Sequence, residues 1–315
     1  MANKKKISAF ISVNLILVNA LLCLAYGKIN LSEYYSQTQE RFVTNKIIRI
    51  SKSLIGSPYS EFPLGEGKDS KLVSKPIYLL DEFDCLTYVE TVLALSLSKT
   101  KENFEKIYSD LKYNSQENDF FHRNHFTSVD WNYFNQKKGY LTDITKTIKD
   151  KNGRVIAEIN TTLIDKPSWY KKIATSNTLW QRYAGRNLTE YDKAELKRFM
   201  RKAKAQKSQL SYIPISKLRN NVKRIDLSVL EKIPDASIVE IVRKNWRTKK
   251  ILGTELDISH IGFLIKNNNE FTFRHAHQGD RVVDIDFSKY LEQISKQASF
   301  AGINIQKINT APDIT

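Results

Sequence analysis

The sequence predicts an α+β fold in which helices come first along the chain and an antiparallel sheet comes last. Two observations support this prediction. Apolar residues recur every three or four positions in the segments before residue 112, which is the spacing of helices with one buried face. After residue 237 the pattern changes to short apolar runs separated by turn residues, which is typical of strands. We therefore expect residues 28–315 to form a single elaborated domain.

Three helices are expected in the first part of the chain. The first spans about Ser36 to Leu54 and ends at Gly56. Residues 58–75, rich in Gly, Pro, Ser and charge, are typical of a surface loop. The second helix spans Asp84 to Ser98, with an aspartate that can cap its first turn, and the third spans Asn103 to Leu111.

The middle of the chain is less regular. Residues 122–143, dense in His, Trp and Tyr, are expected to form a long loop, and residues 154–159 a strand. Residues 189–207 are expected to form a basic helix within an insertion at about 185–215. This helix either presents an ordinary solvated face or serves as an arm that binds polymer.

The last part of the chain is expected to supply the sheet. The predicted strands are 238–242, 258–265, 270–277, 281–285 and 303–308, with one helix at 288–295. A nucleophile on an early helix and bases on this later sheet would meet across the helix–sheet interface.

The amino terminus predicts a signal peptide over residues 1–27. Three lysines at positions 4–6 precede an almost wholly apolar run from Ile7 to Leu24, and Ala25-Tyr26-Gly27 fits a signal-peptidase site. Leu22 before Cys23 argues against a lipoprotein, and an uncleaved anchor is the alternative. We expect an exported protein that either stays in the periplasm or cell envelope or is released. Cleavage would leave Cys85 without a partner in its own chain, which is unusual in an oxidising compartment.

The charge of the chain favours anionic partners. The formal net charge is +16, and removal of the three signal lysines would leave about +13. An exported protein meets anionic envelope polymers or lipid headgroups more often than nucleic acid, so we expect no nucleic-acid partner. The charge alone does not choose among these partners.

Cys85 is the candidate nucleophile. It stands at the start of the predicted helix, where the positive end of the helix dipole lowers the pKa of a thiol. Asp84 is most simply the helix cap.

Two histidines on a predicted hairpin are the candidate bases. Lys266-Asn267-Asn268-Asn269 separates two strands, and a turn at Asn267-Asn268 would place His260 directly opposite His275. One imidazole would then act on the thiol while the other orients it. His277 would be a diagonal neighbour of His260 and is the alternative candidate to His275. Zinc bound by these three histidines is an alternative, but it leaves Cys85 without a role. We expect no metal or other cofactor.

These residues resemble a known family. The segments Phe83-Asp84-Cys85-Leu86-Thr87-Tyr88-Val89-Glu90, Ile258-Ser259-His260-Ile261-Gly262-Phe263 and Arg274-His275-Ala276-His277 look like those of NlpC-type papain-like cell-wall hydrolases. The residues around Asp84-Cys85 resemble those of the N-acetylmuramoyl-L-alanine amidase-like branch of these hydrolases. Further similarity lies in Gly56-Ser57-Pro58-Tyr59, Arg123-Asn124-His125-Phe126, Ser128-Val129-Asp130-Trp131 and Val282-Val283-Asp284.

The resemblance implies a papain-like core and hydrolysis of an amide in peptidoglycan or muropeptides. It also implies that Cys85 is the nucleophile, His260 the general base and His275 the orienting residue. Two departures from the family pattern are the asparagine turn and His277, which stands where a serine is usual. The amidase reaction is the first expectation; cleavage of the stem peptide after γ-D-glutamate and non-catalytic wall binding are the alternatives.

Other residues are candidates for the oxyanion hole or for substrate contacts. The backbone N–H of Cys85 and the Tyr59 hydroxyl would stabilise the oxyanion. Arg123 and His125 would contact the substrate, with Arg123 binding muropeptide carboxylates. Trp131 would offer an apolar face to a sugar ring. Loop anchoring is the alternative role for Arg123 and Trp131, and core packing for Tyr59.

Overall fold

The computed structural model describes residues 29–31, 34–35 and 42–310. The predicted signal peptide and Cys23 lie outside these residues. Within them, no helix is both long enough and apolar enough to span a membrane.

The fold is α+β, as the sequence predicts, and its centre is an eight-stranded antiparallel sheet. The strand order is β2-β3-β8-β4-β5-β6-β7, and β1 pairs with β8 beside this path. The strands are β1 Leu141–Asp143, β2 Glu158–Ile164, β3 Gln206–Pro214, β4 Ser237–Arg243, β5 Ile258–Asn267, β6 Glu270–Ala276, β7 Val282–Asp286 and β8 Phe300–Ile308.

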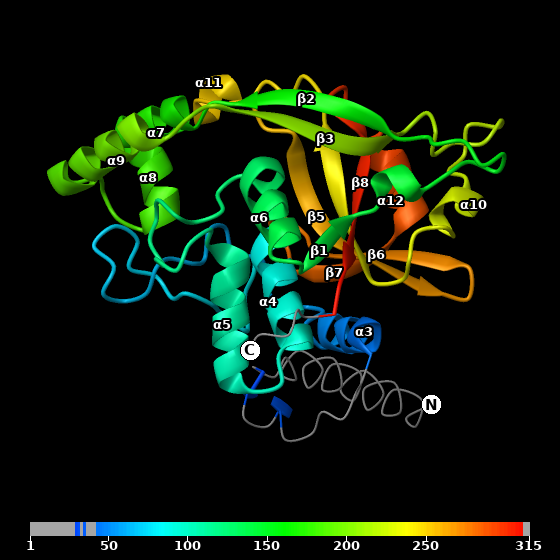
Figure 1. Ribbon diagram of the computed structural model, residues 1–315, viewed down its shortest axis with the longest axis horizontal. Coiled ribbons are helices and arrows are strands. Elements are labelled where there is room, and N and C mark those ends of the chain that lie inside the picture. Colours follow the sequence, from blue (N-terminus) through cyan, green and yellow to red (C-terminus); the bar gives the residue numbers. More distant parts are fainter. Residues whose placement is uncertain (1–28, 32–33, 36–41, 311–315) are drawn as a thin grey trace, which may run out of the picture.

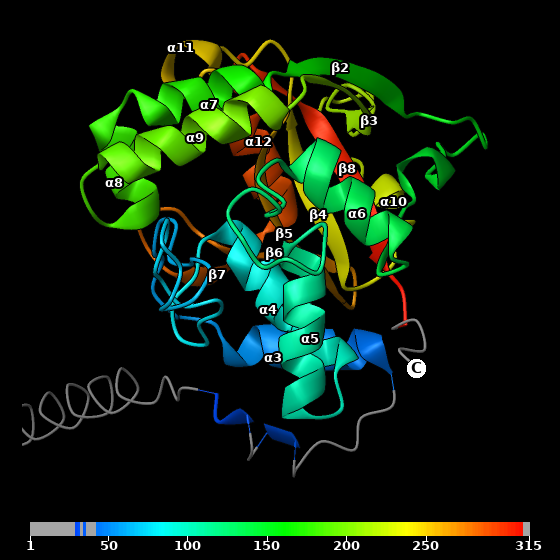
Figure 2. The same ribbon diagram turned by 60° about the vertical axis from the view of Figure 1, so that its left-hand side comes forward.

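Helices cover both faces of the sheet. They are α3 Val43–Ser53, α4 Cys85–Leu97, α5 Lys101–Lys112, α6 Asn132–Lys137, α7 Lys166–Ala174, α8 Asn177–Ala184, α9 Glu190–Lys202, α10 Leu227–Leu230, α11 Lys249–Leu252 and α12 Phe287–Ile294. Helices α3, α4 and α5 pack together below the sheet, and α7, α8 and α9 form a separate group at one end of β2 and β3 (Figures 1 and 2).

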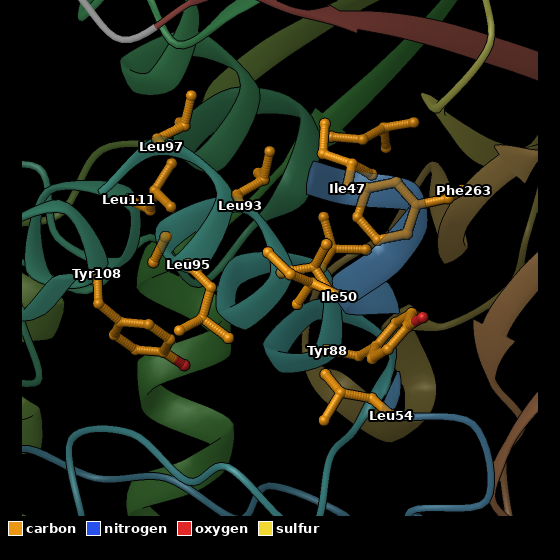
Figure 3. Packing of buried hydrophobic residues seen from close by; sticks show 14 of the residues in the cluster. Ile47, Ile50, Leu54, Tyr88, Leu93, Leu95, Leu97, Tyr108, Leu111 and Phe263 are labelled. Atoms are coloured by element: carbon orange, nitrogen blue, oxygen red, sulfur yellow. The ribbon is translucent and has the colours of Figure 1, made fainter. Parts of the chain in front are cut away.

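Helix α4 is the centre of the larger core. Its Tyr88 and Leu93 pack with Ile47 and Ile50 of α3 and with Phe263 of β5 (Figure 3). A second core joins Leu264 of β5 to α12. Because successive side chains of a strand point to opposite faces, α4 and α12 lie on opposite faces of β5. The start of α4 is thereby fixed against one face of the strand that carries His260.

Polar bonds tie the hairpin of β5 and β6 to the amino-terminal helix. The Arg274 guanidinium forms a two-pronged ion pair with Asp284, at 2.6 and 2.7 Å, and also donates to Ser51 Oγ at 3.0 Å. The Tyr88 hydroxyl donates to the Ser51 carbonyl at 3.0 Å. Ser51 therefore connects α3, α4 and β6 beneath the candidate active site.

Several predicted elements differ from the observed ones. The expected loop at 122–143 contains the π-helical turn Thr127–Trp131, α6 and β1, because Trp131 and Asn135 are buried there. The strand expected at 154–159 runs instead from Glu158 to Ile164. The first helix begins at Val43 within the described residues.

The basic helix expected at 189–207 ends at Lys202. Residues 206–214 form β3, which pairs with β2 and β8. The segment expected as an insertion at about 185–215 thus contributes a strand to the central sheet. The helices α7 and α8 were not predicted from the sequence.

Candidate active site

Cys85 is the first residue of α4, as the sequence predicts. The Asp84 carboxylate accepts hydrogen bonds from the backbone N–H groups of Leu86, at 3.0 Å, and Thr87, at 2.8 Å. The Thr87 hydroxyl in turn accepts from the Asp84 backbone N–H at 2.9 Å, which completes a capping box. These bonds fix where the helix starts and therefore where the thiol lies.

The environment of the thiol overturns one expectation. Burial and the adjacent Asp84 carboxylate raise the pKa of Cys85 to about 12, although the backbone N–H groups of Ile261, Leu86 and Cys85 itself act to lower it. The helix start therefore acts on the pKa in the predicted direction, but burial and the Asp84 carboxylate outweigh it, and the net pKa is raised. The thiol is neutral at pH 7 and needs a base before it can attack.

The two predicted histidines are directly bonded to each other. His260 Nε2 and His275 Nδ1 are 2.6 Å apart, and the two rings are nearly perpendicular. Burial lowers the pKa of His260 well below its ordinary value and lowers that of His275 to about 4. Both imidazoles are therefore neutral at pH 7. When His260 donates through Nε2, its Nδ1 keeps a free lone pair.

The register of the hairpin differs from the prediction by two residues. The tight turn is Asn268-Asn269, both with positive φ, so Phe263 pairs with Arg274 rather than with Thr272. His275 accordingly lies opposite Gly262 and diagonally from His260. A Cβ on Gly262 would lie 2.8 Å from the His275 Cβ, so the absence of a side chain lets the two imidazoles meet. A shift of two residues also leaves both histidines on the same face.

The nucleophile and the base lie on adjacent segments. The Cys85 thiol lies against the backbone N–H of Ile261, the residue after His260. Among the described residues, no hydrogen bond joins the Cys85 sulfur to His260. Catalytic hydrogen bonds are often long in unliganded enzymes and shorten when substrate binds.

Tyr59 is held beside the thiol by backbone bonds on both sides. Its N–H donates to the Asp280 carbonyl at 2.9 Å, and Ser60 N–H donates to the Phe83 carbonyl at 3.0 Å. Burial, and secondarily Cys85, raise the pKa of the Tyr59 hydroxyl, which therefore stays protonated and able to donate.

A pocket of about 230 Å³ opens beside Cys85. Four further residues expected at the site line it: Tyr59, Asp84, Arg123 and His125. Phe62, Leu64, Leu86 and Tyr183 supply apolar walls, and Glu90 and Lys112 add buried ionisable groups. Lys112 donates to the carbonyl oxygens of Gly65 and Ile77, at 2.7 and 2.8 Å. Glu90 belongs to the family-like segment that begins at Phe83 but was not predicted as a site residue, and Lys112 was not predicted at all.

Arg123 and His125 also have structural partners. The Arg123 guanidinium forms a buried ion pair with Glu66 and donates to the Leu64 carbonyl at 3.3 Å. His125 Nε2 bonds to the Phe120 carbonyl at 2.6 Å, and its ring packs on Trp169. Arg123 therefore anchors its loop, the alternative role considered for it, although it also lines the pocket.

Trp131 does not provide a sugar platform. Its side chain is fully buried in the core around α4, and its indole N–H donates to Glu90 Oε1 at 3.0 Å. The prediction that Trp131 contacts the substrate is therefore wrong, because the side chain is buried in the core around α4.

His277 is exposed, and its ring lies 5.7 Å from that of His275. The geometry of the three histidines does not suit zinc, because His260 Nε2 and His275 Nδ1 are bonded to each other. In the described part of the chain, the group whose ligand atoms converge closely enough for a metal is Glu117, Asp119 and His122. It has no connection to Cys85.

Tyr290 and Arg243 belong to the site but were not predicted. The Tyr290 ring lies 5.5 Å from that of His275, and its pKa is raised by burial, with a further contribution from Cys85. Arg243 donates to Ser259, the residue before His260, at 2.8 Å. Neither residue belongs to a motif, so only the fold brings them to the two histidines.

The family model that describes N-acetylmuramoyl-L-alanine amidase-like proteins matches residues 49–299 of this chain. The chain belongs to this AmiA-like family. Membership in the AmiA-like family indicates an enzyme that acts on cell-wall amides, with peptidoglycan or a muropeptide as its substrate. A search of curated proteins gave no match.

Solved structures show the same fold. A protein from Legionella pneumophila str. Philadelphia 1 is 35% identical with a TM-score of 0.80, over 88% of this chain and 92% of that chain. An N-acetylmuramoyl-L-alanine amidase from Bacteroides uniformis ATCC 8492 is 18% identical with a TM-score of 0.59, over 84% and 98%. A putative xylanase from Bacteroides fragilis is also 18% identical, with a TM-score of 0.57, over 82% and 100%. The last two similarities concern the fold alone.

Proposed function

We propose that this AmiA-like protein is a cysteine-dependent N-acetylmuramoyl-L-alanine amidase. It would cut the amide between the lactyl group of N-acetylmuramic acid and L-alanine, in peptidoglycan or in muropeptides. The observation that carries the proposal is the position of Cys85, which starts a capped helix beside the bonded pair of His260 and His275. Exposure of such a substrate outside the cytoplasm agrees with the expected export, which we retain as part of the proposal.

The proposed reaction begins with a neutral thiol and a neutral imidazole. His260 Nδ1 removes the thiol proton as sulfur attacks the carbonyl carbon, and His275 stabilises the imidazolium through the bond at 2.6 Å. The carbonyl oxygen becomes an oxyanion, which the backbone N–H of Cys85 and the Tyr59 hydroxyl would stabilise.

The second half of the reaction returns the enzyme to its starting state. Imidazolium His260 gives its proton to the nitrogen of L-alanine, the C–N bond breaks and a thioester remains on Cys85. Water, deprotonated by His260, then attacks the thioester, which releases the lactyl carboxylate and restores the thiol. Atoms and protons balance without a cofactor.

Mass spectrometry of purified muropeptides after digestion tests the reaction. Release of an intact stem peptide that begins with L-alanine supports the amidase. Truncated stem peptides as the main product would assign a stem-peptide endopeptidase instead. Binding without turnover in the wild-type protein would leave only a wall-binding role.

Two variants test the residues. We expect Cys85→Ala to abolish turnover and His260→Ala to lower kcat by at least about 10³-fold, because one removes the nucleophile and the other the base. Iodoacetamide should inactivate the wild type, whereas inactivation by a chelator with resistance to iodoacetamide would contradict the cysteine mechanism. His277→Ala is the matched control and should retain most of the activity.

A further inference from the structure

Arg243 lies where the regular sheet is interrupted next to the candidate base. It is the last residue of β4, and the pairing of β4 shifts register with β5 between Ile241 and Val242 and with β8 between Val242 and Arg243. Such irregularities redirect side chains and are common beside active sites. Ile241, two residues earlier, pairs with His260.

Neutral groups hold the guanidinium of Arg243. Nε donates to Ser259 Oγ at 2.8 Å and Nη1 donates to Ser299 Oγ at 3.3 Å. The guanidinium carbon lies 5.7 Å from the centre of the Trp246 ring. Two of its five N–H groups are thus engaged, and the side chain is oriented on three sides.

No carboxylate of the described residues forms an ion pair with Arg243, although the residue is half-buried. Burial lowers the pKa of its guanidinium, and Tyr290 acts in the opposite direction. A partly desolvated cation without a counter-ion is costly, and an anionic ligand removes that cost. The position beside Ser259 and His260 would place this anion close to the reacting amide.

We propose that Arg243 is a specificity residue that binds a carboxylate of the stem peptide, namely the α-carboxylate of its second residue, D-glutamate. This assignment rests on the proposed amidase function. The bond cut precedes L-alanine, so the first carboxylate along the stem belongs to the next residue. An arginine fork fits a carboxylate through two parallel hydrogen bonds, whereas a carboxamide offers one acceptor and an unfavourable donor.

A pair of substrates that differ in one group tests the proposal. The substrates are disaccharide tripeptides with D-glutamate or D-isoglutamine as the second stem residue. We expect Arg243→Gln to lower kcat/KM for the glutamate substrate by about 10²-fold, mainly through KM, and to change the isoglutamine substrate by less than about 3-fold. Arg243→Lys should recover part of the loss. Arg247→Gln, at an exposed arginine of the same loop, is the matched control. Equal losses on both substrates would overturn the proposal and assign Arg243 a structural role.

Alkylation of Cys85 separates this proposal from the amidase proposal. Iodoacetate carries a carboxylate and iodoacetamide does not, so Arg243 should favour the first. We expect the ratio of their rate constants with Cys85 to fall at least about fivefold in Arg243→Gln and to stay unchanged in Arg247→Gln. An unchanged ratio in Arg243→Gln would overturn anion binding by Arg243. A reduced ratio in a protein that cleaves neither tripeptide would reject the amidase and the stem peptide while keeping an anion site beside the thiol.

Discussion

Two arginines lie near different parts of the candidate active site, and they are held in opposite ways. Arg123 lines the pocket beside α4 and forms a buried ion pair with Glu66. Arg243 lies on the sheet side, bonded to two serines and stacked on Trp246, without an acidic partner among the described residues. The charge of Arg123 is therefore satisfied within the protein, whereas that of Arg243 is available to a ligand.

The presence or absence of an acidic partner distinguishes a structural arginine from one that can bind a ligand. Membership of a family-like motif does so less well. Arg123 belongs to a family-like segment and was the residue expected to bind carboxylates. Arg243 belongs to no motif. A neutralised guanidinium gains little from a second carboxylate, because the first has already compensated its desolvation.

The largest expected effect is on stability, in which substitutions of the two arginines should differ. Arg123→Met should lower the free energy of unfolding by about 3–5 kcal/mol, because Glu66 would remain buried without a partner. Arg243→Gln should cost less than about 1 kcal/mol, since only neutral partners are lost. Urea denaturation measures both. The double variant Glu66→Gln, Arg123→Met should recover much of the loss. Equal stability of Arg123→Met and Arg243→Gln would contradict the difference between the two arginines.

The free energy of unfolding should also depend on pH, because of His275 on the sheet. The pKa of His275 is lowered to about 4 in the folded protein, so the unfolded chain binds a proton first as the pH falls below about 6.5. Stability is therefore complete at pH 7 and decreases between pH 6.5 and 4, by up to about 3 kcal/mol from this residue. Urea denaturation at pH 7, 5 and 4 measures the slope. His275→Gln should flatten it, and an identical slope in that variant would contradict the buried neutral imidazole.

Substitution of Gly262 sharpens the comparison, because it disturbs the contact between the strands of the two histidines. A Cβ there would lie 2.8 Å from the Arg274 carbonyl oxygen and from the His275 Cβ, so Gly262→Ala should cost about 1–3 kcal/mol and reduce turnover. Gly153→Ala is the control for loss of a glycine, because its Cβ meets no atom within 4 Å; its φ of +77° adds a backbone strain that Gly262 does not have. Full turnover in Gly262→Ala would show that the close approach of the strands is unimportant for the histidine pair.

The smallest effect on stability is expected at the cap of α4. Asn caps helices about as well as Asp, so Asp84→Asn should change stability by less than about 1 kcal/mol. It removes the negative charge that raises the pKa of Cys85, so the thiol pKa should fall and alkylation by iodoacetamide at pH 8 should become faster. Thr87→Val, which weakens the capping box without changing its charge, is the control. Equal alkylation rates in the wild type and Asp84→Asn would contradict the role given to the carboxylate.

Local patterns predicted the elements that carry the chemistry. The helix at Cys85, its aspartate cap and the hairpin of His260 and His275 all follow from periodicity and turn residues. The predicted turn was displaced because three consecutive asparagines tolerate positive φ equally well. The histidines still met because the displacement was by two residues, which preserves the face of each strand.

The remaining features depend on tertiary contacts that no short pattern encodes. Trp131 resembles an exposed sugar platform in sequence, but packing against Glu90 buries it. Helices α7 and α8 have mixed composition and are stabilised by the aromatic cluster around Trp169 and Trp180. Arg243 reaches the site through an irregularity of β4, and its missing counter-ion becomes evident only when its surroundings are known.

The position of β8 has a consequence for biosynthesis. This strand is the last one within the described residues; it lies between β3 and β4, and β4 in turn borders the strand of His260. A growing chain that has already produced Cys85 still lacks the strand at the middle of its sheet until Phe300–Ile308 is made. Pairing between such distant parts of a sequence is slow. The hydrolase should therefore be inactive as a nascent polypeptide and acquire its reactive centre only after Phe300–Ile308 has been made and paired.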